Sequence, residues 1–320
     1  MTEFSPDYSD TELQNHPGDI PSLEPAVTVE QLNAADEPRL FQSFTLPEPQ
    51  PIVRIPNFGH MLIFGLIAAV AAVCSGLLTK LALARHMFGV TTAKQAATEI
   101  HYALGSEAIL YLLMLAGCLT IFPIVWRKPF LTGLQWNFAV AIRLRWKLAA
   151  AAFSCFLFAL VSQALIPGPS NAPIDNIFQS SAAAWMLFAF GVTFAPFFEE
   201  MAFRGFLLPA VCTAFDWLVA RNTNRPALPL DENGHPQWSK PAKITGAIAV
   251  SLPFALLHAP QDGWSIGPFG LLVAVSIVLC AVRLRTRSLA ASTLMHATYN
   301  FLLFSTMLLG TDGFRHLDKM

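Results

Sequence analysis

Residues 185–220 read WMLFAFGVTFAPFFEEMAFRGFLLPAVCTAFDWLVA, an apolar run that Glu199, Glu200 and Arg204 interrupt near its middle. A charged side chain at the centre of a membrane helix costs roughly 2.5–3.5 kcal/mol on insertion scales. Such residues therefore usually face the protein interior or a wet cavity, where they pair or act. The stretch predicts a membrane helix that carries a buried polar site.

The composition places the whole chain among membrane proteins. Hydrophobic residues make up 54% of its 320 residues, charged residues only 13%, and the mean hydropathy is +0.50. Because about 20 apolar residues cover the hydrocarbon core, the pattern predicts an all-α, polytopic transmembrane helical bundle with about seven spans, or eight. The expected spans are 60–83, 106–126, 147–166, 182–210, 244–262, 266–282 and 289–309.

Lysine and arginine are distributed unevenly among the connections. They are concentrated in 127–147, 221–243 and 283–287, whereas 167–181 and 259–265 contain neither. The positive-inside rule then predicts a cytoplasmic N-terminus and, for an odd number of spans, a C-terminus outside. We expect a multi-pass protein of the cell (plasma) membrane, in contact with the lipid bilayer.

The N-terminal segment 1–56 differs from the rest of the chain. It holds ten acidic residues, two arginines, nine of the 23 prolines and no long apolar run. Such a segment cannot bury enough apolar surface to offset its chain entropy, so we predict a disordered, acidic, cytoplasmic tail that could recruit a partner. The transmembrane domain is expected at 57–310, followed by a short C-terminal tail at 311–320. This charge pattern gives no reason to expect nucleic acid.

The apolar run that contains the acidic pair is too long for one crossing. It extends over 181–220, with Pro196 just before the acids. Either one long helix continues past the membrane surface, or two shorter helices are broken near Pro196. If the span ended at Glu199, His258 would lie near the opposite face, roughly 20 Å away at about 1.5 Å per residue. A shared site requires a crossing centred near residue 200, and we expect that arrangement.

Two acids and an arginine at this spacing can form an ion pair and still leave one carboxylate for proton transfer. On a helix Glu200 and Arg204 are i,i+4 neighbours and can pair, whereas Glu199 lies about 100° around the helix from Glu200. One carboxylate can thus be neutralised while the other stays free for proton transfer. The alternative is a helix-stabilising salt bridge at the membrane surface.

Later apolar runs carry His258 and the pair His296 and Asn300. A neutral imidazole can accept a proton, position water or bind a metal ion. A histidine and an asparagine at i,i+4 offer two donors for a polarised carbonyl or an oxyanion. The alternatives are a packing or membrane-edge histidine for the first, and an interhelical hydrogen-bond pair for the second.

Three motifs, in this order on apolar helices, resemble the CPBP family, which comprises the type II CAAX prenyl endopeptidases and Abi-like membrane proteases. They are E-E-x-x-x-R at 199–204, F-x-x-x-H at 254–258 and H-x-x-x-N at 296–300. The resemblance covers about 145–310. It implies a membrane-embedded, CAAX-type endopeptidase that hydrolyses a peptide bond in a membrane or peptide substrate.

The resemblance also implies a role for each motif residue. By matching position, Glu199 and His258 would activate the water that attacks a peptide carbonyl. Glu200 and Arg204 would set the geometry and charge of the site. This division is the same as the one that the spacing of the first motif allows.

The third motif, His296 and Asn300, would stabilise the tetrahedral oxyanion. If a metal takes part, Glu199, His258 and His296 could supply oxygen and nitrogen ligands for zinc. Since the chain has no H-E-x-x-H pair, direct activation of water by Glu and His is favoured over a zinc site. No other cofactor is expected.

Two other classes of function stay open. One is an ion- or proton-coupled membrane transporter whose path is lined by the buried Glu, Arg and His side chains. It predicts an internal repeat, and the two halves of the sequence show no convincing match. The other is a catalytically silent membrane scaffold of the same fold.

Overall fold

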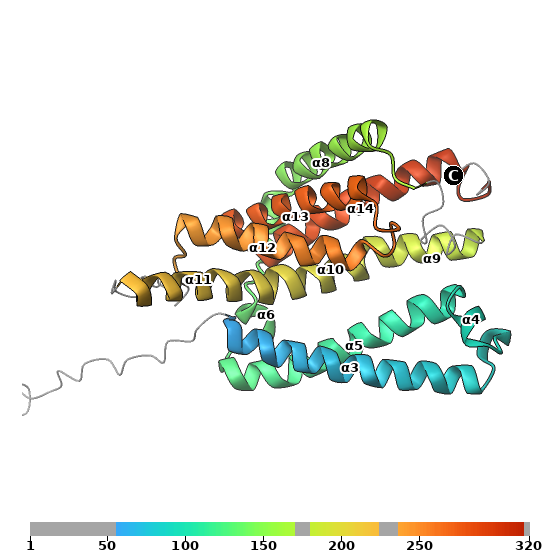
Figure 1. Cartoon of the computed structure of the whole chain (residues 1–320), viewed down its shortest axis with the longest axis horizontal. Helices are drawn as coiled ribbons and strands as arrows, with labels where there is room; N and C mark the ends of the chain where they lie inside the picture. The colour runs from blue at the N-terminus through green and yellow to red at the C-terminus, as the bar shows by residue number, and fades with distance from the viewer. Residues whose placement is uncertain (1–55, 170–179, 224–235, 317–320) are drawn as a thin grey trace, which may run out of the picture. The chain divides into compact units, whose positions relative to one another are not determined.

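The computed structural model describes residues 56–169, 180–223 and 236–316, and its helices belong to one compact unit, 52–320. The fold is an all-α, polytopic bundle, as the sequence predicts (Figure 1). The predicted acidic tail lies outside the described residues except for Pro56, so its disorder stays a prediction.

Ten helical segments make up the bundle within the described residues. They are α3 Phe58–Ala84, α5 Ile100–Trp126, α8 Arg145–Leu165, α9 Ser181–Val192, α10 Phe194–Glu200, the π-helix η3 Met201–Leu207, α11 Leu208–Thr223, α12 Lys240–His258, α13 Ile266–Thr286 and α14 Leu289–Gly310. Shorter helices lie in the connections: η1 Met87–Gly89, α4 Ala93–Ala96, α6 Phe130–Gly133 and α7 Phe138–Arg143.

Six of the helical stretches among the described residues are long and apolar enough to cross a membrane. They are α3, α5, α8, the run Ser181–Thr223, α12 and α13, and they overlap the first six predicted spans. The seventh predicted span forms α14, which does not meet the same criterion because His296, Asn300 and several hydroxyl side chains lower its hydropathy. The chain is a multi-pass membrane protein, while the count of seven and the side of the C-terminus stay predictions.

The helix pairs that hold the bundle together are adjacent in Figure 1. Helix α12 packs on α13 and α11, α14 packs on α8 and α13, and α3 packs on α5. The approach of α12 to α11 is close because Gly246 has no side chain: a Cβ there would lie 2.5 Å from Sγ of Cys212. Small residues at such contacts let membrane helices pack tightly.

The run Ser181–Thr223 combines the two arrangements that the sequence left open. It continues as one line of helix, but α9 ends before Thr193, whose backbone has φ −114° and ψ −66°. Pro196 follows three residues later and cannot donate a backbone hydrogen bond, which accounts for the break. The acidic pair then lies in the middle of the run, as a shared site requires.

A second proline, Pro209, accounts for the π-helix that follows the two acids. Residues 201–207 form the π-helix η3, and Pro209 stands two residues further on. In an α-helix the ring of Pro209 would clash with the carbonyl of Gly205, four residues earlier, and its missing N–H would leave that carbonyl unpaired. A π-helical turn relieves this conflict, and such turns are frequent at functional sites.

Candidate active site

Three helices bring one carboxylate between two imidazoles. Glu199 lies near the end of α10, His258 is the last residue of α12, and His296 lies in the first half of α14. The distance from Glu199 Oε1 to His258 Nε2 is 3.6 Å, and that from Glu199 Oε2 to His296 Nε2 is 3.7 Å. Residues that are far apart in the sequence therefore meet around Glu199.

The second carboxylate is buried and paired. Glu200 and Arg204 are both 0% exposed, and Arg204 Nη1 lies 2.9 Å from Glu200 Oε1. The same oxygen lies 3.1 Å from His296 Nδ1. Arg204 also donates through Nη2 to Oγ of Ser276 on α13, at 2.7 Å. The ion pair therefore lies inside the bundle, while its depth in the membrane stays a prediction.

The contacts of Phe254 explain why the second motif contains an aromatic residue. Its ring lies beneath the guanidinium of Arg204, with 4.4 Å from Cζ to the ring centroid. The same ring lies 4.8 Å from that of His258 and 5.9 Å from that of His296, centroid to centroid. A cation over an aromatic face is stabilised by the ring quadrupole. Phe254 thus forms an apolar wall against which the charged and titratable side chains are held.

Hydrogen bonds assign the proton-bearing nitrogen of each imidazole. Nδ1 of His258 lies 2.9 Å from the carbonyl oxygen of Phe254, and since a carbonyl only accepts, Nδ1 donates. Nδ1 of His296 donates in the same way to the carboxylate of Glu200. In a neutral ring the other nitrogen, Nε2, then carries a lone pair. Both Nε2 atoms face Glu199 at distances too long for a direct hydrogen bond.

Asn300 differs from the other five predicted site residues because its side chain bonds to the backbone of another helix. Its Nδ2 donates to the carbonyl oxygen of Gly191 at 2.8 Å. That carbonyl belongs to the last turn of α9, where carbonyls have no partner within the helix. Asn300 therefore ties α14 to α9, which is the interhelical role that the sequence allowed as an alternative. Its role as an oxyanion donor stays a prediction.

The structure adds two residues that the motifs do not contain. Glu107 on α5 accepts a hydrogen bond of 2.7 Å from the hydroxyl of Tyr111, and it interacts electrostatically with Glu199 and His258. The ring of Tyr111 stacks on Phe198, with centroids 4.4 Å apart. The sequence signal was present, because Glu107 is an acid at the start of a predicted apolar span.

A further acid lies just beyond the end of α12. Asp262 belongs to the connection between α12 and α13, and its backbone N–H approaches the carbonyl of His258 at 3.4 Å. Burial raises the pKa of Asp262 above its ordinary value, and the charge that His258 can carry opposes this rise. The connection thus places a second carboxyl group beside His258, outside the spans.

The residues proposed as zinc ligands do not form a metal cluster. Across the described part of the chain, no group of three or more His, Cys, Asp or Glu side chains is arranged to hold a metal ion. Glu200 is also already engaged by Arg204 and His296. No step proposed below uses a zinc ion.

Residues 180–302 match the family model of the type II CAAX prenyl endopeptidases, Rce1-like. This match contains all three motifs and confirms, over these residues, the resemblance that they indicate. The matched family is a family of membrane proteases, which agrees with the multi-pass architecture. A search of curated proteins and a search of solved structures gave no match.

Proposed function

We propose that the protein is an intramembrane endopeptidase that hydrolyses a peptide bond with Glu199 as its general base. The observation that carries this proposal is the position of Glu199 between two imidazole Nε2 atoms, beside a second carboxylate that Arg204 neutralises. The 3.6 Å gap between Glu199 and His258 suits a water that donates one hydrogen to each of them. Such a water presents an oxygen lone pair to a substrate.

The proposed reaction is a balanced hydrolysis. The water oxygen attacks the carbonyl carbon of the scissile bond, and Glu199 takes the proton that the water loses. The carbonyl oxygen becomes an oxyanion. When the C–N bond breaks, Glu199 passes its proton to the leaving amine, so that one carboxylic acid and one amine are formed. His258 keeps the water in place and shares its second hydrogen.

The proposed oxyanion donors are His296 and Asn300. His296 donates through Nε2 when its ring carries both protons, and its Nδ1 contact with Glu200 fixes the orientation of the ring. Asn300 has a second N–H besides the one that Gly191 accepts. Preorganised donors of this kind stabilise charge where it develops in the transition state.

Glu200, Arg204 and Glu107 have supporting roles in this proposal. The ion pair of Glu200 and Arg204 positions His296 and keeps one negative charge in the site neutralised. Glu107 is not in contact with the proposed water but acts on Glu199 and His258 through its charge. We class it as a positioning residue.

We further propose a membrane-associated polypeptide as substrate, the plasma membrane as location and a cytoplasmic N-terminus. The orientation is supported by the lysines and arginines in 127–147, 221–243 and 283–287. The CAAX-type substrate class is supported by the family match at 180–302.

The experiment that tests the function is a cleavage screen with the purified full-length protein. A library of peptides and membrane proteins is incubated with the wild-type protein, with Glu199→Gln, and with the matched control Glu99→Gln at a half-buried acid outside the candidate site. New chain termini are then identified by mass spectrometry. We expect products from the wild type and the control but not from Glu199→Gln. Cleavage by all three, or by none, would contradict the proposal and favour a transporter or a scaffold.

A further inference from the structure

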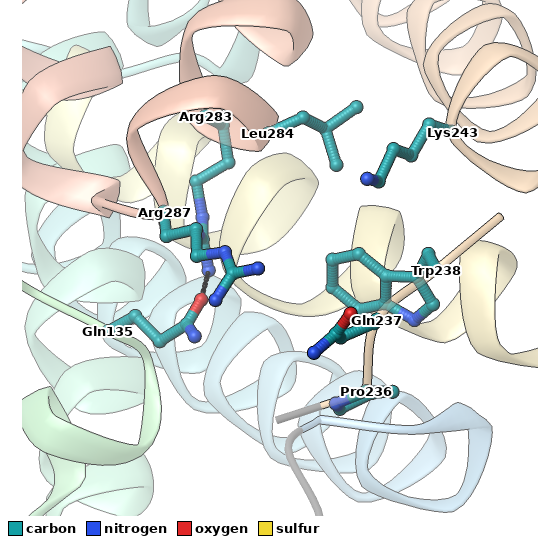
Figure 2. Close-up of a pocket in the computed structure, with 8 residues that line it drawn as sticks. All are labelled: Gln135, Pro236, Gln237, Trp238, Lys243, Arg283, Leu284 and Arg287. Carbon is teal, nitrogen blue, oxygen red and sulfur yellow. Dashed lines mark hydrogen bonds between the residues drawn. The ribbon is translucent and has the colours of Figure 1, made fainter. Parts of the chain in front are cut away.

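A polar cleft lies at the end of the bundle where α12 begins and α13 ends (Figure 2). Its cavity volume is about 30 Å³, and it is partly open to solvent. Three cationic side chains line it: Lys243, Arg283 and Arg287. Gln135 and Trp238 line it as well. Figure 2 shows the charged ends of Lys243 and Arg287 directed toward its middle. The cleft is separate from the residues around Glu199.

Arg283 is the buried cation of this cleft. It is 3% exposed, and Nη2 donates to Oε1 of Gln135 at 2.6 Å and to the carbonyl oxygen of Leu134 at 3.4 Å. Both partners are neutral, and among the described residues Nε has no hydrogen-bond partner. A guanidinium removed from water is costly unless a negative charge and further acceptors compensate it. The geometry therefore leaves a charge to be neutralised and a donor to be satisfied.

Within the described residues the charge of Glu200 acts on Arg283 electrostatically, but no carboxylate reaches Arg283 as an ion-pair partner. None lines the cleft, and none forms an ion pair with Arg283 or Lys243. Asp216, on the neighbouring α11, is engaged elsewhere: its two oxygens accept hydrogen bonds from the backbone N–H and the hydroxyl of Ser239, at 3.0 and 2.6 Å. Among the described residues, the lining of the cleft thus carries cationic but no anionic side chains.

The position of the cleft favours a lipid headgroup as the source of that anion. Lys243 lies in the first turn of α12 and Arg283 in the last turn of α13, and both helices are candidate spans. The ends of a span lie at the depth of the headgroups. Trp238 is held by a hydrogen bond of 3.0 Å from Nε1 to Oγ1 of Thr213, and tryptophan is enriched at this depth.

We propose that this cleft binds the phosphate group of an anionic phospholipid. The planar guanidinium of Arg283 suits two parallel hydrogen bonds to phosphate oxygens, and the ammonium of Lys243 adds a further donor group. A phosphodiester at this place would neutralise Arg283 and fasten the start of α12 to the end of α13. The proposal does not depend on the protease function.

The test is thermal unfolding of the delipidated, full-length protein in detergent. Phosphatidylglycerol, phosphatidylcholine and inorganic phosphate are added separately to the wild type, to Lys243→Gln and to Arg285→Gln. Arg285 is an exposed cation on the same turn of α13 that does not line the cleft, so its variant controls for charge. We expect phosphatidylglycerol to raise Tm in the wild type and in Arg285→Gln, and to raise it much less in Lys243→Gln.

The arms of this experiment separate the sources of the phosphate. A rise in Tm with phosphatidylglycerol alone supports a lipid headgroup, and an equal rise with inorganic phosphate supports the same site with a soluble anion. An equal rise with phosphatidylcholine, or an equal response of wild type and Lys243→Gln, would overturn the proposal. If Lys243→Gln does not fold, Lys243→Met, which removes the same charge, takes its place with the same expected result.

Discussion

The buried carboxylate of Glu200 fixes the imidazole of His296: Oε1 of Glu200 lies 3.1 Å from Nδ1 of His296. Because Nδ1 is held there, Nε2 on the other side of the ring faces Glu199. The two adjacent acids of the first motif therefore have different structural roles. Glu200 orients a ring and pairs with Arg204, while Glu199 faces the Nε2 atoms of both imidazoles.

The Glu200–Arg204 ion pair predicts a specific pattern of stability. Glu200→Gln leaves the guanidinium of Arg204 buried without its partner, which should destabilise the protein by about 3–5 kcal/mol. Glu199→Gln, whose side chain has no such ion pair with arginine, should change Tm little. The measurement is thermal unfolding of both variants. The double change Glu200→Gln with Arg204→Met removes both charges and should recover most of the stability without restoring cleavage. Equal Tm values for Glu199→Gln and Glu200→Gln would contradict this account.

Asn300 allows the structural and the catalytic role to be separated. Asn300→Ala leaves the carbonyl of Gly191 without its donor, which should cost about 1–3 kcal/mol of stability. If Asn300 is also an oxyanion donor, kcat should fall by about 10²–10³-fold at a temperature where the variant is fully folded. The two readouts are Tm and kcat. A lower Tm with an unchanged kcat would leave Asn300 as an interhelical tie alone.

Glu107 is predicted to affect turnover more than substrate binding. Glu107→Gln keeps an oxygen for the hydroxyl of Tyr111 but removes the negative charge that acts on Glu199 and His258. We expect kcat to fall about tenfold, a change of about 1.4 kcal/mol in the barrier, with KM unchanged. Tyr111→Phe, which removes only the hydrogen bond, is the matched control and should have a smaller effect. Wild-type kcat in Glu107→Gln would refute the positioning role.

Removal of metal ions should leave cleavage intact. The side chains of the described residues form no cluster for a metal ion, and the proposed steps use only Glu and His. Cleavage of the best library substrate is measured before and after dialysis against a chelator, and again after zinc is added. Loss of cleavage with the chelator and its recovery with zinc would move the site to the metal-dependent class.

Much of the fold and of the site follows from the sequence because the relevant signals are local. Runs of about 20 apolar residues predicted the helices, and the cost of burying charge pointed to Glu199, Glu200 and Arg204. The family match over 180–302 confirms the resemblance that the motifs indicate. The sequence predicted that Glu199 and Glu200 lie close to His258 and His296 only if all of them belong to one site.

Other features depend on how helices pack, which sequence spacing does not reveal. The amide of Asn300 donates a hydrogen bond to a carbonyl at the end of α9. The sequence did not show that α9 ends there, because the break at Thr193 is visible only in the structure. Glu107 belongs to a helix outside the motifs, so nothing in its own span linked it to Glu199. The π-helix at 201–207 results from a conflict between Pro209 and a carbonyl one turn earlier, which a count of apolar residues does not detect.

The central claim, that Glu199 is the general base, is tested most directly by single-turnover cleavage of one library substrate. Equal amounts of folded wild type, Glu199→Gln and the control Glu99→Gln are mixed in excess with labelled substrate, and the rate of product formation is compared. Since general base catalysis typically contributes 10²–10⁴-fold, the account predicts a rate at least about 100-fold lower in Glu199→Gln and an unchanged rate in the control. Cleavage by Glu199→Gln at the wild-type rate would contradict it.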